Sequence, residues 1–189
     1  MNVFELKADA NHYEVLALAD EKDWNKVLER LGEPMCPMWS PLKVEILRDD
    51  EHKDRLPSDF PSLGGVLPVF SRRAVEALKD VLTANGEILP LDCPEGDYLA
   101  YNTRKIVDAL DEGRSALKRF KDGGVMHVVH YEFHPSRLDE VSIFKIPQTV
   151  RSRTYVTDEF VRRVREAGLA GFNFVPVWAL ASEDVVTAA

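Results

Sequence analysis

Cysteine is scarce in this chain: Cys36 and Cys93 are the only two in 189 residues, and each is followed by proline. Neither belongs to a Cys-x-x-Cys motif, so a zinc knuckle is not expected. The chain also begins without a basic region followed by an apolar stretch, so we expect no secretory signal. Two reduced thiols are therefore the expected state, with a disulfide as the alternative.

Long hydrophobic runs are missing as well. Nowhere do 18 apolar residues follow one another, which predicts that no segment spans a membrane. Hydrophobic residues make up 45% and charged residues 30% of the sequence, which is typical of a globular protein with a core. We expect a cytoplasmic protein with a single domain at residues 1–180 and a C-terminal tail at residues 181–189.

The motifs of common enzyme classes are absent too. There is no Gly-x-Ser-x-Gly and no His-Glu-x-x-His, and neither cysteine lies in a known nucleophile motif. SLGGVLP at residues 62–68 lacks the lysine and hydroxyl residue of a P-loop and the third glycine of a dinucleotide fingerprint. We therefore expect no catalytic residues and no cofactor, and we interpret the chain as a non-enzyme.

The strongest metal candidate is HVVHYEFH at residues 127–134. On an extended strand His130, Glu132 and His134 share one face, with neighbours about 6.5 to 7 Å apart. His130 and Glu132 could reach one ion, whereas convergence of all three needs a bend or bulge. The polar face of a half-buried edge strand explains the same pattern, so we expect no metal. A small metal-dependent hydrolase that uses these three side chains is the rival hypothesis.

Helices are predicted where a capping residue precedes apolar residues at helical spacing. Ser71 caps one helix, which a left-handed turn at Asn85-Gly86 ends. Thr157 caps another, and a third is predicted over residues 102–110. The residues predicted to face the core from the first two helices are Val75, Leu78, Val81, Leu82, Phe160, Val161 and Val164.

Strands are predicted where turn residues enclose either an alternation of apolar and polar residues or a short continuous apolar segment. These segments are residues 12–19, 42–47, 87–91, 98–102, 141–147 and 171–178, with a hairpin over residues 117–134. Asp122-Gly123 is placed at the tip of the hairpin. The fold class that follows is α+β: a mixed, largely antiparallel sheet with three or four short helices packed mainly on one side.

The whole chain has a net charge of −8, and its excess of acidic side chains lies in the first half. Residues 1–95 carry 11 basic and 19 acidic side chains, whereas residues 96–189 carry 13 of each. Such a chain repels nucleic acid and anionic membranes, so neither is expected as a partner. The acidity favours a cationic protein partner, and the alternative is that it serves solubility alone.

Two segments of the first half are predicted to contact that partner. RDDEHKDRLPSD at residues 48–59 is dense in carboxylates, which speed association with a cationic protein. MCPMWSP at residues 35–41 contains the tryptophan that we expect to be most exposed, and an exposed tryptophan is a common anchor of interfaces. The predicted partner-binding residues are Trp39, Asp49, Asp50, Glu51, Asp54 and Asp59.

Five strings in succession carry a family resemblance. They are PSLGGVLPVFSRRAVEAL, GEILPL, YLAYNTRKIVDALDEGRS, FHPSRLDEVSIFKIPQ and YVTDEFVRRVREAGLAGFNFVPVW. In this order the chain resembles the immunity protein 11 family of bacterial polymorphic-toxin systems, formerly a domain of unknown function. The resemblance covers roughly residues 12–178; residues 1–11 and the insert at residues 48–59 have no match in it.

The resemblance implies a non-enzymatic protein that is made beside a secreted toxin. Such a protein binds the toxin and so protects the cell that produces it. The resemblance brings no catalytic residue, and residues that recognise a particular toxin are expected in the unmatched segments. If the toxin is a nuclease, the carboxylates at residues 48–59 would imitate its substrate phosphates. A regulatory adaptor without any toxin is the second rival, and the sequence leaves homo-oligomers open.

Overall fold

The computed structural model describes residues 1–31, 33–65 and 67–180. Within these residues there are twelve β-strands and four short α-helices. Seven of the strand pairs formed by these residues are antiparallel and two are parallel. The predicted α+β class, with a mixed and largely antiparallel arrangement of strands, is confirmed.

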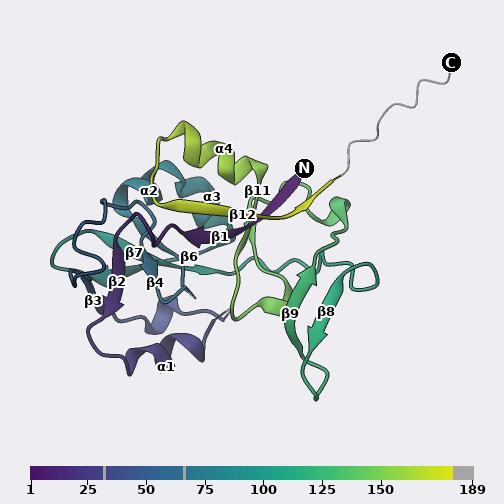
Figure 1. The fold of residues 1–189 in the computed structure, drawn as a ribbon, viewed down its shortest axis with the longest axis horizontal. Helices are drawn as coiled ribbons and strands as arrows, with labels where there is room; N and C mark the ends of the chain where they lie inside the picture. Colours follow the sequence, from purple (N-terminus) through teal and green to yellow (C-terminus); the bar gives the residue numbers. More distant parts are fainter. Residues whose placement is uncertain (32, 66, 181–189) are drawn as a thin grey trace.

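The strands form three sheets. The first has the order β10 (Ile143–Phe144), β11 (Tyr155–Thr157), β1 (Asn2–Ala8) and β12 (Phe172–Ala179), antiparallel throughout. In the middle of β1, Glu5 lies opposite Tyr155 on one side and Val175 on the other. Strand β12 runs along β1 at the edge of this sheet (Figure 1) and contains Pro176, a residue that sheets tolerate at an edge.

The second sheet has six strands. Their order is β4 (Ser62–Leu63), β2 (Val15–Leu18), β3 (Leu42–Ile46), β6 (Gly86–Asp92), β7 (Tyr98–Thr103) and β5 (Val69–Ser71). Along β3 the buried residues Leu42, Val44 and Ile46 alternate with the exposed residues Lys43 and Glu45. One face of β3 therefore packs on the core while the other is open to solvent.

The predicted helix after Ser71 consists of two short helices, α2 (Arg72–Ala77) and α3 (Lys79–Asn85). Ser71 caps α2 as predicted, since its hydroxyl accepts the Ala74 N–H at 3.1 Å. The backbone leaves the helical conformation at Leu78, where φ is −111° and ψ is 14°. The predicted left-handed turn at the end is wrong: Gly86 is extended, because α3 leads directly into β6 and Gly86 pairs there with Thr103.

Helix α4 (Asp158–Glu166) follows Thr157 and ends before Gly168, which has a φ of 60°. Thr157 holds the capping position, but its hydroxyl donates to the Val141 carbonyl at 2.8 Å and makes no cap hydrogen bond. Helices α2, α3 and α4 lie together, whereas α1 (Asp23–Leu28) lies apart from them (Figure 1). All seven core-facing residues predicted for these helices are buried: Val75, Leu78, Val81, Leu82, Phe160, Val161 and Val164.

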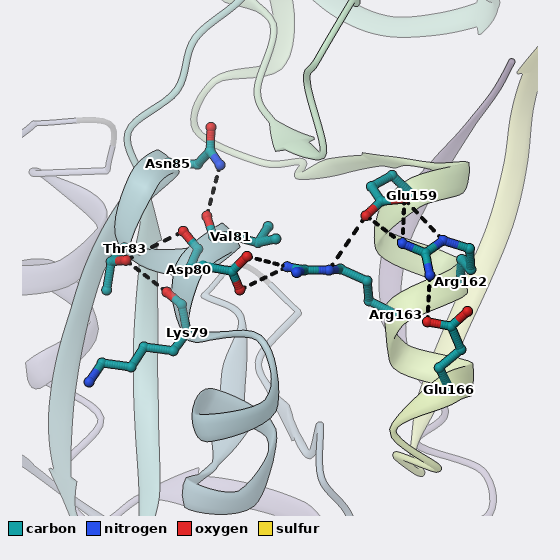
Figure 2. Close-up of polar contacts among 9 residues, drawn as sticks. All are labelled: Lys79, Asp80, Val81, Thr83, Asn85, Glu159, Arg162, Arg163 and Glu166. Carbon is teal, nitrogen blue, oxygen red and sulfur yellow. Dashed lines mark hydrogen bonds and ion pairs between the residues drawn. The ribbon is translucent and has the colours of Figure 1, made fainter.

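Helices α3 and α4 are joined on their outer surfaces by charges (Figure 2). The Arg163 guanidinium contacts the Asp80 carboxylate across the two helices at 2.7 Å and Glu159 within α4 at 3.5 Å. Arg162 bonds Glu159 and Glu166, one turn before and after it. Exposed pairs of this kind add little stability each, so the packing of the apolar faces is what holds the two helices together.

The helix predicted over residues 102–110 does not form. Ile106 makes a β-bridge with Lys145, and Leu110 makes one with Phe133, so the segment is used as an extended connection. Only three short 3₁₀ helices occur among the described residues: η1 (Cys36–Met38), η2 (Pro135–Arg137) and η3 (Pro147–Thr149). The helix was predicted from apolar spacing, which is a local pattern. The extended conformation that forms instead is stabilised by contacts with segments far along the chain.

The third sheet is the predicted hairpin, β8 (Ala116–Arg119) and β9 (Val125–His130). Gly123 at its tip has a φ of 89°, which the predicted Asp-Gly turn supplies. The hairpin projects from the body of the molecule (Figure 1).

No helix in the described part of the chain is long and apolar enough to cross a membrane. The predicted tail at residues 181–189 lies outside the described residues.

Candidate functional site

Residues 49–54, which we call the acidic turn, leave the six-stranded sheet shortly after β3. Four of the six predicted partner-binding residues lie here, and all four are exposed: Asp49, Asp50, Glu51 and Asp54. The side chain of Asp50 is 99% exposed. The carboxylates are thus presented to solvent, as contact with a partner requires.

The acidic turn is tied to the sheet at both ends. Before it, Arg48 contacts the carboxylates of Glu95 at 3.2 Å and Glu14 at 3.8 Å. After it, the Leu56 backbone N–H donates to the His12 carbonyl at 3.0 Å, and the Leu56 carbonyl accepts the Glu14 N–H at 2.9 Å. Both ends of the turn are therefore fixed before any partner arrives, which lowers the entropy lost on binding.

Some of the charges on the acidic turn are matched within it. The His52 ring lies 2.5 Å from an Asp49 oxygen, and this hydrogen bond lowers the pKa of Asp49 below its usual value. Lys53 lies 3.1 Å from Asp50. Within the described residues, the carboxylates of Glu51 and Asp54 make no hydrogen bond or ion pair. Those two carboxylates are the ones most open to a cationic side chain.

Asp59, the fifth predicted carboxylate, is placed differently. It is only 8% exposed, and its oxygens accept from the Ser71 hydroxyl at 2.7 Å and the Ala170 N–H at 3.0 Å. The Arg73 guanidinium also forms an ion pair with the Asp59 carboxylate at 2.7 Å. Asp59 therefore joins the start of α2 to the segment after α4, and its burial removes it from the surface that a partner could contact.

Trp39 is half-buried, as are Trp24 and Trp178, so the structure does not single it out as the most exposed tryptophan. Its indole N–H donates to the Pro90 carbonyl on β6 at 2.8 Å. The ring lines a cavity of about 410 Å³, which we call the Trp39 pocket. The residues that line the pocket are Asp23, Glu29, Arg30, Met35, Met38, Trp39, Ser40, Pro41 and Leu42.

Glu87 on β6 fixes the segment that carries Trp39. Its carboxylate accepts the backbone N–H groups of Met35 at 2.9 Å and Cys36 at 3.2 Å, and the side-chain amide of Asn102 at 2.8 Å. Burial acts to raise the pKa of Glu87, but these donors outweigh it, so the pKa lies below its usual value. One ionised carboxylate thus orders a proline-rich segment that has little regular structure of its own.

The Trp39 pocket and the acidic turn lie at the two ends of the same strand. Leu42, the first residue of β3, lines the pocket, and the acidic turn begins three residues after Ile46, the last. Between them β3 exposes Lys43 and Glu45. The exposed face of β3 therefore connects the Trp39 pocket with the acidic turn.

The three side chains of the rival metal-site hypothesis, His130, Glu132 and His134, do not come together. His130 lies 3.4 Å from one oxygen of Glu132, whose other oxygen accepts the indole N–H of Trp178 at 3.1 Å. That second hydrogen bond lowers the pKa of Glu132. His134 is instead 4.0 Å from Asp111, because β9 ends at His130 and the chain turns away. Among the described residues, no group of three histidine, cysteine or acidic side chains could hold a metal ion.

Sequence reasoning missed a second cavity of about 410 Å³, between β1 and residues 60–68. It contains Glu5, which is 8% exposed and pairs with Arg153 at 2.6 Å and Lys7 at 3.4 Å. Glu5 and Arg153 are 148 positions apart, so no local pattern could relate them. The pair satisfies its own charges, and for this reason we assign the cavity no ligand.

A comparison with models of protein families and one with curated proteins each give no match, so the family resemblance stays a prediction.

Proposed function

We propose that the protein is an immunity protein, which binds a cognate bacterial toxin in a stoichiometric complex and so protects the cell that produces both. In this proposal it acts in the cytoplasm and catalyses no reaction. The succession of strings that resembles the immunity protein 11 family supports the proposal, as does the acidity of the first half of the chain.

The observation that carries the proposal is the exposed acidic turn. Asp49, Asp50, Glu51 and Asp54 are all exposed, while the residues on either side of the turn are bonded to the rest of the protein. Charged residues that served solubility alone would not need such fixed positions. An acidic and solvent-facing segment that is anchored at both ends is suited to binding a cationic protein surface.

The proposed mechanism has two steps. Long-range attraction first brings the cationic toxin toward the acidic turn, which raises the rate of encounter. The bound immunity protein then covers the working surface of the toxin. If that toxin is a nuclease, the carboxylates of the turn take the places of substrate phosphates against its lysine and arginine side chains.

Co-expression tests this proposal. The chain is produced together with the product of the reading frame adjacent to its gene, and growth and co-purification are scored. We expect growth to be restored and a complex of fixed stoichiometry to be isolated. Equal killing with and without the chain would contradict the proposal.

Two further measurements separate the rival hypotheses. Elemental analysis that finds stoichiometric zinc or manganese in the purified protein would favour the metal-dependent hydrolase. Absence of any toxin gene beside the gene for this chain would favour the adaptor. For the hydrolase, the three side chains would have to move together, because His130 lies beside Glu132 whereas His134 lies beside Asp111.

A further inference from the structure

The Trp39 pocket combines an apolar floor with a charged rim. The apolar part consists of Met35, Met38, Trp39, Pro41 and Leu42. Met38 is 65% exposed, which makes it one of the two most exposed large apolar side chains among the described residues. Methionine adapts its shape to different bound groups, and tryptophan is a frequent anchor of protein interfaces.

The floor of the pocket is held in place by the sheet below it. Glu87 fixes the backbone at Met35 and Cys36, and the Pro90 carbonyl fixes the indole of Trp39. A side chain that enters therefore meets a ring whose position is already set. Such pre-organisation reduces the entropy lost on binding.

The rim carries two carboxylates and one guanidinium. Asp23 is the first residue of α1, Glu29 directly follows its last residue, and Arg30 comes next. Within the described residues, the side chains of Glu29 and Arg30 make no hydrogen bond or ion pair. Glu29 lies in the half of the chain, residues 1–95, in which 19 acidic side chains outnumber 11 basic ones.

We infer that the Trp39 pocket receives a lysine or arginine side chain of the bound protein. The aliphatic stem of such a side chain packs against the methionines and the indole, while its cationic end reaches the carboxylate of Glu29. Arg30 then faces outward to the backbone or an acidic neighbour of the inserted residue. This inference rests on the proposed function for the identity of the partner.

The pocket and the acidic turn have different tasks in this arrangement. The exposed turn acts at a distance and sets the rate of association. The pocket encloses one side chain and slows dissociation, as buried anchors of interfaces do. A partner that contacts both sites would lie along the exposed face of β3.

Nuclear magnetic resonance of methionine methyl groups can test the pocket without the toxin. The full chain is labelled with ¹³C at its four methionine methyl groups, of which Met35 and Met38 line the pocket while Met1 and Met126 do not. The probes are N-acetyl-arginine amide, N-acetyl-lysine amide, N-acetyl-norleucine amide and N-acetyl-glutamate amide. Norleucine retains an apolar chain without charge, and glutamate reverses the charge.

We expect the arginine and lysine probes to shift the Met35 and Met38 signals with half-saturation at millimolar concentration, and to leave Met1 and Met126 unchanged. Glu29→Gln should weaken binding of these two probes about two- to fivefold, the range expected for one exposed ion pair. Glu21→Gln is the matched control, because Glu21 precedes α1 and does not line the pocket. It should leave the affinity unchanged.

Three results would overturn the inference: no shift at Met35 and Met38, an equal shift with norleucine, or a larger shift with glutamate. The outcome is independent of the co-expression experiment. Selective binding of the cationic probes together with unrelieved killing would refute the immunity function alone. Restored growth without any selectivity for cationic probes would refute the role of the pocket alone.

Discussion

At the scale of single residues, Asp50 and Asp59 show that position in the fold decides what a carboxylate does. Asp50 is almost fully exposed on the acidic turn. Asp59, nine positions later, is buried and bonded to Ser71, Arg73 and the Ala170 N–H. Only the first is available to a partner, although the sequence presents the two in one acidic segment.

Replacing Asp49, Asp50 and Glu51 by serine should slow association with the toxin about tenfold, because long-range attraction is reduced. Serine at position 49 can still accept the backbone N–H groups that Asp49 accepts, so the turn should keep its shape. Stopped-flow or surface-based kinetics would measure the rates.

The control for this experiment has the same change of charge elsewhere. Glu76, Asp122 and Asp139 are exposed and lie outside the acidic turn and the Trp39 pocket. If replacing these three by serine slowed association equally, net charge and not the acidic turn would set the rate.

Lys145 is the most deeply buried cation among the described residues, at 1% exposure. Its ammonium group donates to the Val150 carbonyl at 2.7 Å. Burial lowers its pKa from 10.5 to about 8. Between these two values the unfolded chain binds a proton that the folded chain does not, so the folded state gains stability as the pH rises.

Lys145→Met should remove this dependence on pH. The stability of the wild type relative to the variant should rise by about 3 kcal/mol between pH 8 and pH 10.5, and should be constant below pH 8. Urea unfolding of both proteins at several pH values measures the difference. Lys105→Met, at an exposed neighbouring lysine, is the control and should give a flat difference.

At the scale of secondary structure elements, Ser71 has two roles at the start of α2. Its hydroxyl accepts the Ala74 N–H and donates to Asp59, so it connects the helix to the buried carboxylate. Ser71→Ala should lower the free energy of unfolding by about 1–2 kcal/mol, because the cap and a partner of Asp59 are lost together. Chemical denaturation followed by circular dichroism measures this.

Thr83→Ala serves for comparison with Ser71→Ala. Thr83 is an exposed residue of α3 whose hydroxyl bonds the Lys79 carbonyl one turn earlier, a contact that helices do not need. The substitution should change stability by less than about 0.5 kcal/mol. Equal losses for the two variants would show that capping is not what makes Ser71 important.

At the scale of the whole molecule, the charge of −8 should make association with a cationic toxin sensitive to salt. Screening shortens the reach of exposed charges from roughly 10 Å at 0.1 M salt to about 3 Å at 1 M. The association rate should therefore fall steeply with added sodium chloride while the dissociation rate changes little. An association rate independent of salt would contradict steering by the acidic turn.

Several features could be predicted because they depend on neighbours in the sequence. The alternation along β3, the cap at Ser71 and the Gly123 turn all follow from residues within a few positions of one another. The helix predicted over residues 102–110 failed for the opposite reason. Its apolar residues are used in bridges to Lys145 and Phe133, which lie far along the chain.

The sequence by itself determined the α+β class, the apolar faces of the helices and the acidity of the first half, since these depend on local periodicity and composition. Only the tertiary structure decided that Asp59 is buried, that Glu5 pairs with Arg153, and that Trp39 lines a pocket. The physical reason is that burial and ion pairing depend on which distant segments pack together. That packing is a property of the whole chain, and no short stretch of sequence contains it.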